Sequence, residues 1–136
     1  MHYVISDIHG SERRLDSILA QIDLKRADTL YVLGDVIDRG EYGAELLLWM
    51  TQQPNMELIL GNHEAMLLSC AFLFADVNEE SLVALTPENL ELVQNWAENG
   101  GRPTMKGLQK LLKQDPELVV GILEYLRDCP LYEEVE

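Results

Sequence analysis

The sequence predicts an α/β fold in which helices flank a parallel sheet, and two observations carry that prediction. Three short apolar runs, at residues 2–6, 29–33 and 56–60, recur along the first half of the chain. Each run is followed by a cluster of Asp, Asn or His residues with a glycine, and then by a stretch of helical periodicity. Strands that alternate with helices in this way are typical of a parallel sheet. We therefore expect three strands, the first of them buried.

The helices of the first half are predicted by the spacing of apolar residues. One helix face, with the i, i+3, i+4 and i+7 positions apolar, is formed by Leu15, Ile18, Leu19 and Ile22. A second helix is expected over residues 42–52, and a third from residue 63 to residue 74. The first half of the chain is thus expected to alternate strand and helix throughout.

The second half predicts helices only. Thr86-Pro87-Glu88 is typical of a helix start, because Pro is favoured at the first helical position and an acid in the first turn. This helix is expected to stop at Asn99-Gly100-Gly101, since Asn and Gly tolerate positive φ. Two further helices are expected over residues 105–113 and 116–126.

The composition argues against several classes of partner. The chain has 136 residues, with 24 acidic against 10 basic side chains and a net charge of −14 at pH 7. This surplus disfavours binding to nucleic acid or to an anionic membrane. No apolar run long enough to span a membrane and no signal-peptide pattern is present, so we expect a cytoplasmic protein. The isolated Cys70 and Cys129 are expected to be reduced and structural.

Candidate metal ligands follow each of the three apolar runs. Asp7 and His9 follow the first run, Asp35 follows the second, and Asn62 and His63 follow the third. Loops at the carboxyl ends of parallel strands converge, so these side chains are expected to share one cleft. Carboxylate, amide and imidazole donors together suit divalent ions such as Mn²⁺, Fe²⁺ or Zn²⁺. Asp35 is the natural bridge between two ions.

The three clusters resemble the motifs of the calcineurin-like metallophosphoesterases. Residues 7–10, 34–40 and 61–64 match the Asp-x-His-Gly, Gly-Asp-x-x-Asp-Arg-Gly and Gly-Asn-His-Glu motifs, in order and at family spacing. The closer resemblance is to the bacterial and lambda-phage-like form of the Ser/Thr phosphoprotein phosphatases. The segment from Trp96 through Asn99-Gly100-Gly101 to Thr104 is similar to a segment of those bacterial enzymes. We interpret it as a helix stop without a role in the chemistry.

The resemblance implies a fold and a cofactor. It implies one metallophosphoesterase domain over residues 1–136, with a metal-binding half at 1–76 and a helical insert at 77–128. Two divalent ions are implied, with Mn²⁺ as the first candidate and Fe or Zn as others. Asp7 and His9 are the implied ligands of the first ion, Asp35 the bridging ligand and Asn62 a ligand of the second that also faces a phosphate oxygen.

The resemblance also implies catalytic roles. His63 is the implied general acid and Asp38 the carboxylate that orients it, although a loop cap or a third metal ligand are alternatives for Asp38. Arg39 is expected to bind phosphoryl oxygens, with a salt bridge to Glu64 as its alternative use. Gly10, Gly34, Gly40 and Gly61 are expected to let the loops approach the metals closely.

The function implied is hydrolysis of phosphoserine and phosphothreonine, with phosphotyrosine as a further candidate, by direct attack of a hydroxide held between two metal ions. The substrate partner is then a phosphorylated protein or peptide. One alternative is diadenosine tetraphosphate hydrolysis, which we rank second because that group tends to differ at the positions of Asp38 and Glu64. Another is a non-catalytic binding module.

The carboxyl end departs from the family pattern. Related enzymes supply two further metal-binding histidines and an arginine after the helical insert, whereas this chain has only His2, His9 and His63. Residues 131–135 stand where the next strand of the fold would begin. We therefore expect the chain to be the amino-terminal part of a longer phosphatase, and expect weak metal retention and little turnover from this part alone.

Overall fold

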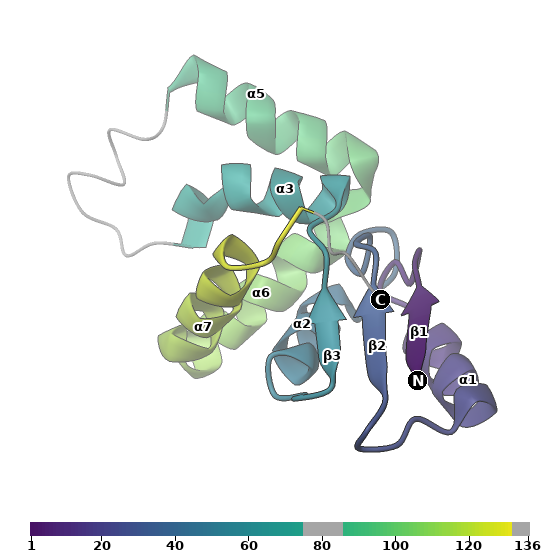
Figure 1. The fold of residues 1–136 in the computed structure, drawn as a ribbon. Helices are drawn as coiled ribbons and strands as arrows, with labels where there is room; N and C mark the ends of the chain where they lie inside the picture. Colours follow the sequence, from purple (N-terminus) through teal and green to yellow (C-terminus); the bar gives the residue numbers. More distant parts are fainter. Residues whose placement is uncertain (75–85, 132–136) are drawn as a thin grey trace.

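The computed structural model describes residues 1–74 and 86–131, which form a parallel sheet with helices around it (Figure 1). The strands are β1 (His2–Ile5), β2 (Thr29–Val32) and β3 (Met56–Leu58), in the order β1-β2-β3. Ile5 is paired with Val32, and Val32 with Leu58, so the three strands end at the same edge of the sheet. The predicted α/β fold with a parallel sheet is confirmed.

The helices of the first half lie where the apolar spacing predicts them. They are α1 (Glu12–Ile22), α2 (Gly43–Met50) and α3 (Asn62–Ser69), followed by the short 3₁₀ helix η1 (Ala71–Phe74). Helix α1 begins because the Ser11 side chain accepts a hydrogen bond from the backbone N–H of Arg14, and it ends at Asp23 in the left-handed conformation. Each helix directly follows one of the polar clusters.

The expectation that the first strand is buried is wrong for half of its residues. Residues of β1 alternate between exposed and half-buried, and Val4 is 57% exposed. The reason is that β1 is an edge strand, and the described helices pack only on the face that carries Tyr3 and Ile5. The central strand β2 is the buried one, with Leu30 and Val32 fully enclosed.

The second half of the described chain is helical. Its elements are α5 (Pro87–Trp96), the π-helical turn η2 (Ala97–Gly101), α6 (Arg102–Gln114) and α7 (Pro116–Arg127). Side chains of Thr86 and Asp115 cap the starts of α5 and α7, each with Pro at the first position. The predicted stop at residues 99–101 is instead a kink, because Gly100 alone leaves helical geometry, with φ of 96°, and α6 begins immediately afterwards.

Helices α2, α6 and α7 pack together beside β3, and α3 lies between α5 and α7 (Figure 1). One continuous core joins the sheet to these helices through fully buried side chains, among them Leu30, Val32, Leu47, Leu67, Trp96, Leu108, Ile122 and Leu126. Among the described helices, none is long and apolar enough to cross a membrane. The strand expected after residue 131 and the first part of the predicted insert, residues 77–85, lie outside the described residues.

Candidate active site

The loops that carry the predicted site residues are joined to one another through their backbones. The N–H of His9 donates to the carbonyl of Asp35 at 2.9 Å, and the N–H of Gly10 donates to the carbonyl of Val36 at 2.6 Å. The N–H of Gly40 donates back to the carbonyl of His9 at 3.0 Å. The first and second motifs therefore form one rigid unit at the carboxyl edge of the sheet, as the α/β topology predicts.

Glycines allow these loops to pack backbone against backbone. A Cβ atom added at Gly40 would lie 2.2 Å from the carbonyl oxygen of His9, and one added at Gly34 would lie 2.4 Å from the Cα of Gly61. No side chain fits at either contact, so both require glycine. These glycines therefore act as backbone devices between one loop and the next, and the expectation that they let the loops approach the metals stays a prediction.

Backbone strain is concentrated at the predicted site. Among the described non-glycine residues, six have positive φ, a region that L-residues rarely adopt. One of them, Asp23, lies at the end of α1, and the other five are all predicted site residues. A conformation that costs free energy persists only where the surrounding structure holds it, and it is typical of functional sites. The five are Asp7, His9, Asp35, Asp38 and Arg39.

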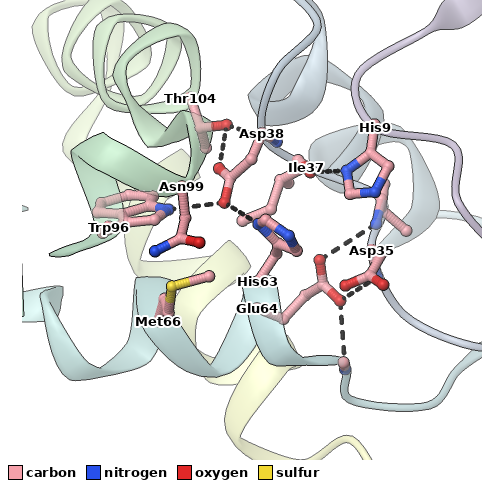
Figure 2. Close-up of polar contacts among 12 residues, drawn as sticks. His9, Asp35, Ile37, Asp38, His63, Glu64, Met66, Trp96, Asn99 and Thr104 are labelled. Atoms are coloured by element: carbon pink, nitrogen blue, oxygen red, sulfur yellow. Dashed lines mark hydrogen bonds and ion pairs between the residues drawn. The ribbon is translucent and has the colours of Figure 1, made fainter.

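Asp7, His9 and Asp35 form a cluster suited to a divalent cation. One ligand atom from each lies within 4.8 Å of the other two. The Nδ1 atom of His9 is 3.0 Å from the carbonyl oxygen of Ile37 and donates to it, because a carbonyl can only accept (Figure 2). With its proton on Nδ1, the ring directs Nε2 toward the cluster, where Nε2 lies 3.6 Å from Asp7 Oδ1.

The carboxylate of Asp35 supplies an independent test of that fit. Its Oδ1 atom is buried and has no hydrogen-bond partner, the one such side-chain atom in the part of the chain that the structure describes. A buried carboxylate oxygen without a donor is costly unless a cation neutralises it. The donor set of two carboxylates and one imidazole fits a divalent ion such as Mn²⁺, Fe²⁺ or Zn²⁺. The remaining predicted ligand, Asn62, is the exposed first residue of α3, and its role stays a prediction.

Asp38 lies in a different setting three residues further along the same loop. Its side chain is completely buried, and its Oδ2 accepts hydrogen bonds from His63 Nδ1 at 2.7 Å and from Trp96 Nε1 at 2.8 Å (Figure 2). Its Oδ1 accepts from the hydroxyl of Thr104 at 2.8 Å. Both oxygens are therefore occupied by donors, which leaves no role for Asp38 as a third metal ligand.

His63 connects this carboxylate to the metal cluster. Because its Nδ1–H points at Asp38, the Nε2 atom is the one available for proton transfer. The ring of His63 meets the ring of His9 edge to face, with centroids 4.9 Å apart. The imidazole of His63 is therefore next to a candidate metal ligand.

Glu64 holds the second and third motifs together. Its Oε1 accepts from the backbone N–H of Asp35 at 2.7 Å and of Gly61 at 3.2 Å, and its Oε2 accepts from the N–H of Val36 at 3.2 Å. Burial raises the pKa of the Glu64 carboxyl, and the backbone N–H donors oppose that rise. No ion pair between Arg39 and Glu64 is found in the described residues, so the alternative use predicted for Arg39 does not occur there.

Arg39 has an exposed side chain and a fixed backbone. Its N–H donates to the carbonyl of Gly100 at 2.8 Å, and a Cβ added at Gly100 would lie 2.7 Å from Cγ of Arg39. The guanidinium remains free to bind an anion, because none of the ion pairs among described residues involves it.

Sequence reasoning missed Trp96, Gly100 and Thr104 as parts of the site. The motif that contains them was the available signal, and our interpretation of it as a helix stop was too narrow.

Comparison with known proteins identifies the class. Residues 3–133 match the family model described as calcineurin-like phosphoesterase. Because this match covers nearly the whole chain, the chain belongs to the calcineurin-like phosphoesterase family, a family of metal-dependent hydrolases. The expectation of a metallophosphoesterase-type fold is thereby confirmed.

The curated relatives include enzymes named bis(5'-nucleosyl)-tetraphosphatase, symmetrical. The chain is 34% identical over 83 residues to the one from Chromobacterium violaceum, which covers 60% of this chain and 30% of that relative. It is 31% identical over 119 residues to the one from Actinobacillus pleuropneumoniae, covering 85% and 41%. It is 38% identical over 69 residues to the one from Klebsiella pneumoniae, covering 49% and 24%. The chain thus spans less than half the length of each of these relatives.

Proposed function

We propose that the protein is a metal-dependent phosphohydrolase that cleaves dinucleoside tetraphosphates symmetrically. The observation that carries the hydrolase assignment is the ligand cluster of Asp7, His9 and Asp35 placed next to the hydrogen-bonded pair of Asp38 and His63. The substrate class is supported by the similar enzymes that bear the symmetrical tetraphosphatase name. These relatives favour the function that the motifs alone ranked second.

The proposed roles follow from what each side chain can donate. Asp7, His9, Asp35 and Asn62 hold two divalent ions, with Mn²⁺ as the first candidate. Bound ions supply an activated water at neutral pH and stabilise negative charge on the phosphoryl group. The exposed fork of Arg39 binds two phosphoryl oxygens, a geometry that a guanidinium matches and an ammonium does not. Nε2 of His63 gives a proton to the leaving oxygen.

Phosphoprotein dephosphorylation is the second candidate function, and the pair of Asp38 and His63 favours it. A serine or threonine alkoxide is a strongly basic leaving group, so its departure benefits from a general acid. A nucleoside diphosphate leaves as a much weaker base and needs that proton less. A buried carboxylate at 2.7 Å from Nδ1 supports the protonated imidazole that such an acid requires.

Substrate comparison with a His63→Ala variant separates the two candidates. Phosphate or nucleotide release is measured with Mn²⁺ for diadenosine tetraphosphate and for a phosphoserine peptide, in the full-length protein. We expect turnover of the tetraphosphate to exceed that of the peptide. Loss of a general acid costs about 10²–10⁴-fold where the leaving group needs it, so His63→Ala should lower peptide turnover far more than tetraphosphate turnover.

The control is His2→Ala, which removes an exposed imidazole at the amino end of β1, opposite the edge that carries the metal cluster, and should leave both rates unchanged. Faster turnover of the peptide would instead assign the protein to the phosphoprotein phosphatases. Absence of turnover for both substrates would contradict a hydrolase and support the non-catalytic binding module.

A further inference from the structure

We propose that Trp96 and Thr104 are positioning residues that fix Asp38, and through it the His63 imidazole, so that the helical segment of residues 86–131 takes part in the catalytic site. The inference deepens the proposed function, because it concerns the same proton donor. Neither residue touches the metal cluster or a reacting atom. Both reach Asp38 from far along the chain, at separations of 58 and 66 residues.

The first step of the argument is the saturation of the Asp38 carboxylate. Three donors converge on its two oxygens, from an imidazole, an indole and a hydroxyl (Figure 2). A buried carboxylate is stable as an anion only when donors replace the water it has lost. Without the indole of Trp96 and the hydroxyl of Thr104, the imidazole of His63 would be its only side-chain donor among the described residues.

The second step is that the Thr104 hydroxyl also fixes the orientation of the carboxylate. The Thr104 hydroxyl donates to Asp38 Oδ1 at 2.8 Å and accepts from the backbone N–H of Asp38 at 3.0 Å. One hydroxyl therefore bridges the main chain and the side chain of the same residue. Asp38 also has φ of 75°, an unfavourable conformation that this bridge helps to hold.

The third step is that the kink between α5 and α6 is what lets both donors reach one carboxylate. Trp96 ends α5, and Thr104 lies in the first turn of α6. A Cβ atom at Gly101 would lie 2.5 Å from Cδ1 and 2.6 Å from Nε1 of Trp96, so the indole packs directly against the bare backbone there. The glycines of the motif thus serve the geometry of the donors, not only the end of a helix.

The test removes one donor at a time and preserves shape. Trp96→Phe deletes the indole N–H but keeps an aromatic ring, and Thr104→Val deletes the hydroxyl but keeps the volume. Trp49→Phe in α2 and Thr86→Val at the start of α5 are matched controls. Among the described residues, the hydroxyl of Thr86 hydrogen-bonds only within its own helix, which it caps. Thr104→Ser restores the hydroxyl and serves as the rescue variant.

The first readout is the His63 imidazole in the metal-free protein, by nitrogen NMR at a pH at which the ring is neutral. In the parent protein we expect the proton on Nδ1, held by Asp38. In Trp96→Phe and Thr104→Val we expect a mixture of the two tautomers, with return to the parent spectrum in Thr104→Ser. A folded Trp96→Phe protein with an unchanged tautomer would overturn the proposal, and this variant decides the matter if Thr104→Val does not fold.

The second readout is the ratio of turnover for a substrate with a poor leaving group to that for one with a good leaving group, a phosphoserine peptide against an aryl phosphate. A hydrogen bond to a charged group carries enough free energy that we expect this ratio to fall about tenfold in each variant. An equal loss for both substrates would indicate a purely structural role and contradict the proposal. The proposed function fails only if the parent protein does not hydrolyse diadenosine tetraphosphate, and the NMR readout tests the positioning in that case as well.

Discussion

Asp35 and Asp38 are two carboxylates of one loop, three residues apart, and they have opposite surroundings. Both have positive φ, at 56° and 75°. Asp35 has a buried oxygen with no hydrogen-bond partner in the described chain, whereas both oxygens of Asp38 are occupied by donors. The carboxylate of Asp35 is thus available to bind a cation, whereas the carboxylate of Asp38 is occupied by hydrogen-bond donors.

The difference comes from which elements reach each carboxylate. The neighbours of Asp35 in the cluster are Asp7 and His9, from the loop after β1, and neither donates to its free oxygen. The neighbours of Asp38 come from α3, α5 and α6, and each brings an N–H or O–H. A carboxylate beside a second carboxylate attracts cations, while a carboxylate surrounded by donors holds another side chain in place.

The largest effect is expected from Asp35→Asn. The substitution removes the charge of the candidate bridging ligand and keeps its shape, so we expect the affinity for Mn²⁺ to fall about a thousandfold, with turnover lost in parallel. Isothermal titration of Mn²⁺ into the metal-free protein measures it. Asp23→Asn is the matched control, because Asp23 also has positive φ but lies at the end of α1. Equal metal affinity in the parent and Asp35→Asn proteins would contradict the assignment of Asp35 as a metal ligand.

The second effect is on stability and concerns Asp38→Asn. Asparagine places an NH₂ group where one oxygen now accepts, so at least one buried donor loses its acceptor, and we expect a loss of about 3 kcal/mol in unfolding free energy. Denaturant unfolding of the metal-free protein measures it. In the same experiment Asp35→Asn should be neutral or stabilising, because it removes an uncompensated buried oxygen. Similar losses for the two variants would contradict the contrast drawn between them.

The third effect concerns the backbone contact between Gly40 and His9. This contact packs the loop that carries both carboxylates against the loop after β1. Gly40→Ala places a methyl group 2.2 Å from the carbonyl oxygen of His9, where backbone must move, and we expect a loss of about 2 kcal/mol. Gly121→Ala is its control, since Gly121 lies in α7 with nothing within 4 Å of an added Cβ. That substitution should stabilise the protein by about 0.5–1 kcal/mol through helix propensity. Thermal unfolding of the pair separates the two predictions, and a destabilising Gly121→Ala would show that the added methyl group meets a neighbour.

The sequence predicts the metal cluster well and the surroundings of Asp38 only in part, because the hydrogen bond between Asp38 and His63 is predicted and the donors Trp96 and Thr104 are not. Asp7, His9 and Asp35 each follow a strand at the same edge of a parallel sheet, so topology alone brings them together. The partners of Asp38 from the second half lie 58 and 66 residues away, on helices whose packing no local pattern fixes. A threonine and a tryptophan also fit a helical core, so their residue types do not indicate a hydrogen bond to a carboxylate, and the motif that contains both was the one available signal.

The prediction that β1 is buried was wrong for a related reason. An apolar run such as residues 2–6 indicates a strand, but it does not indicate how many faces of that strand are covered. The described helices cover the face with Tyr3 and Ile5 and leave Val4 exposed. Burial of a strand depends on which elements pack over it, and that is settled only by the fold.

The smallest effect concerns Cys129, a partly buried thiol that accepts no hydrogen bond from the described residues. Burial raises the pKa of the Cys129 thiol to about 11, and the charges of Glu64 and Asp128 add to the rise. Its Sγ donates to the carbonyl of Tyr125 and accepts no hydrogen bond from the described residues, so burial favours the neutral thiol. Asp38, in contrast, accepts hydrogen bonds on both oxygens.

A raised pKa makes stability depend on alkaline pH. The folded state retains the Cys129 proton between pH 9.0, the ordinary value for the thiol, and about 11, whereas the unfolded state releases it. The stabilisation is therefore complete below pH 9 and is lost as the pH rises toward 11. We expect the unfolding free energy to fall over that window and Cys129→Ala to flatten the fall, measured by denaturant unfolding at several pH values. A slope unchanged by Cys129→Ala would mean that the thiol is solvated in the folded state and that burial without donors does not set its charge.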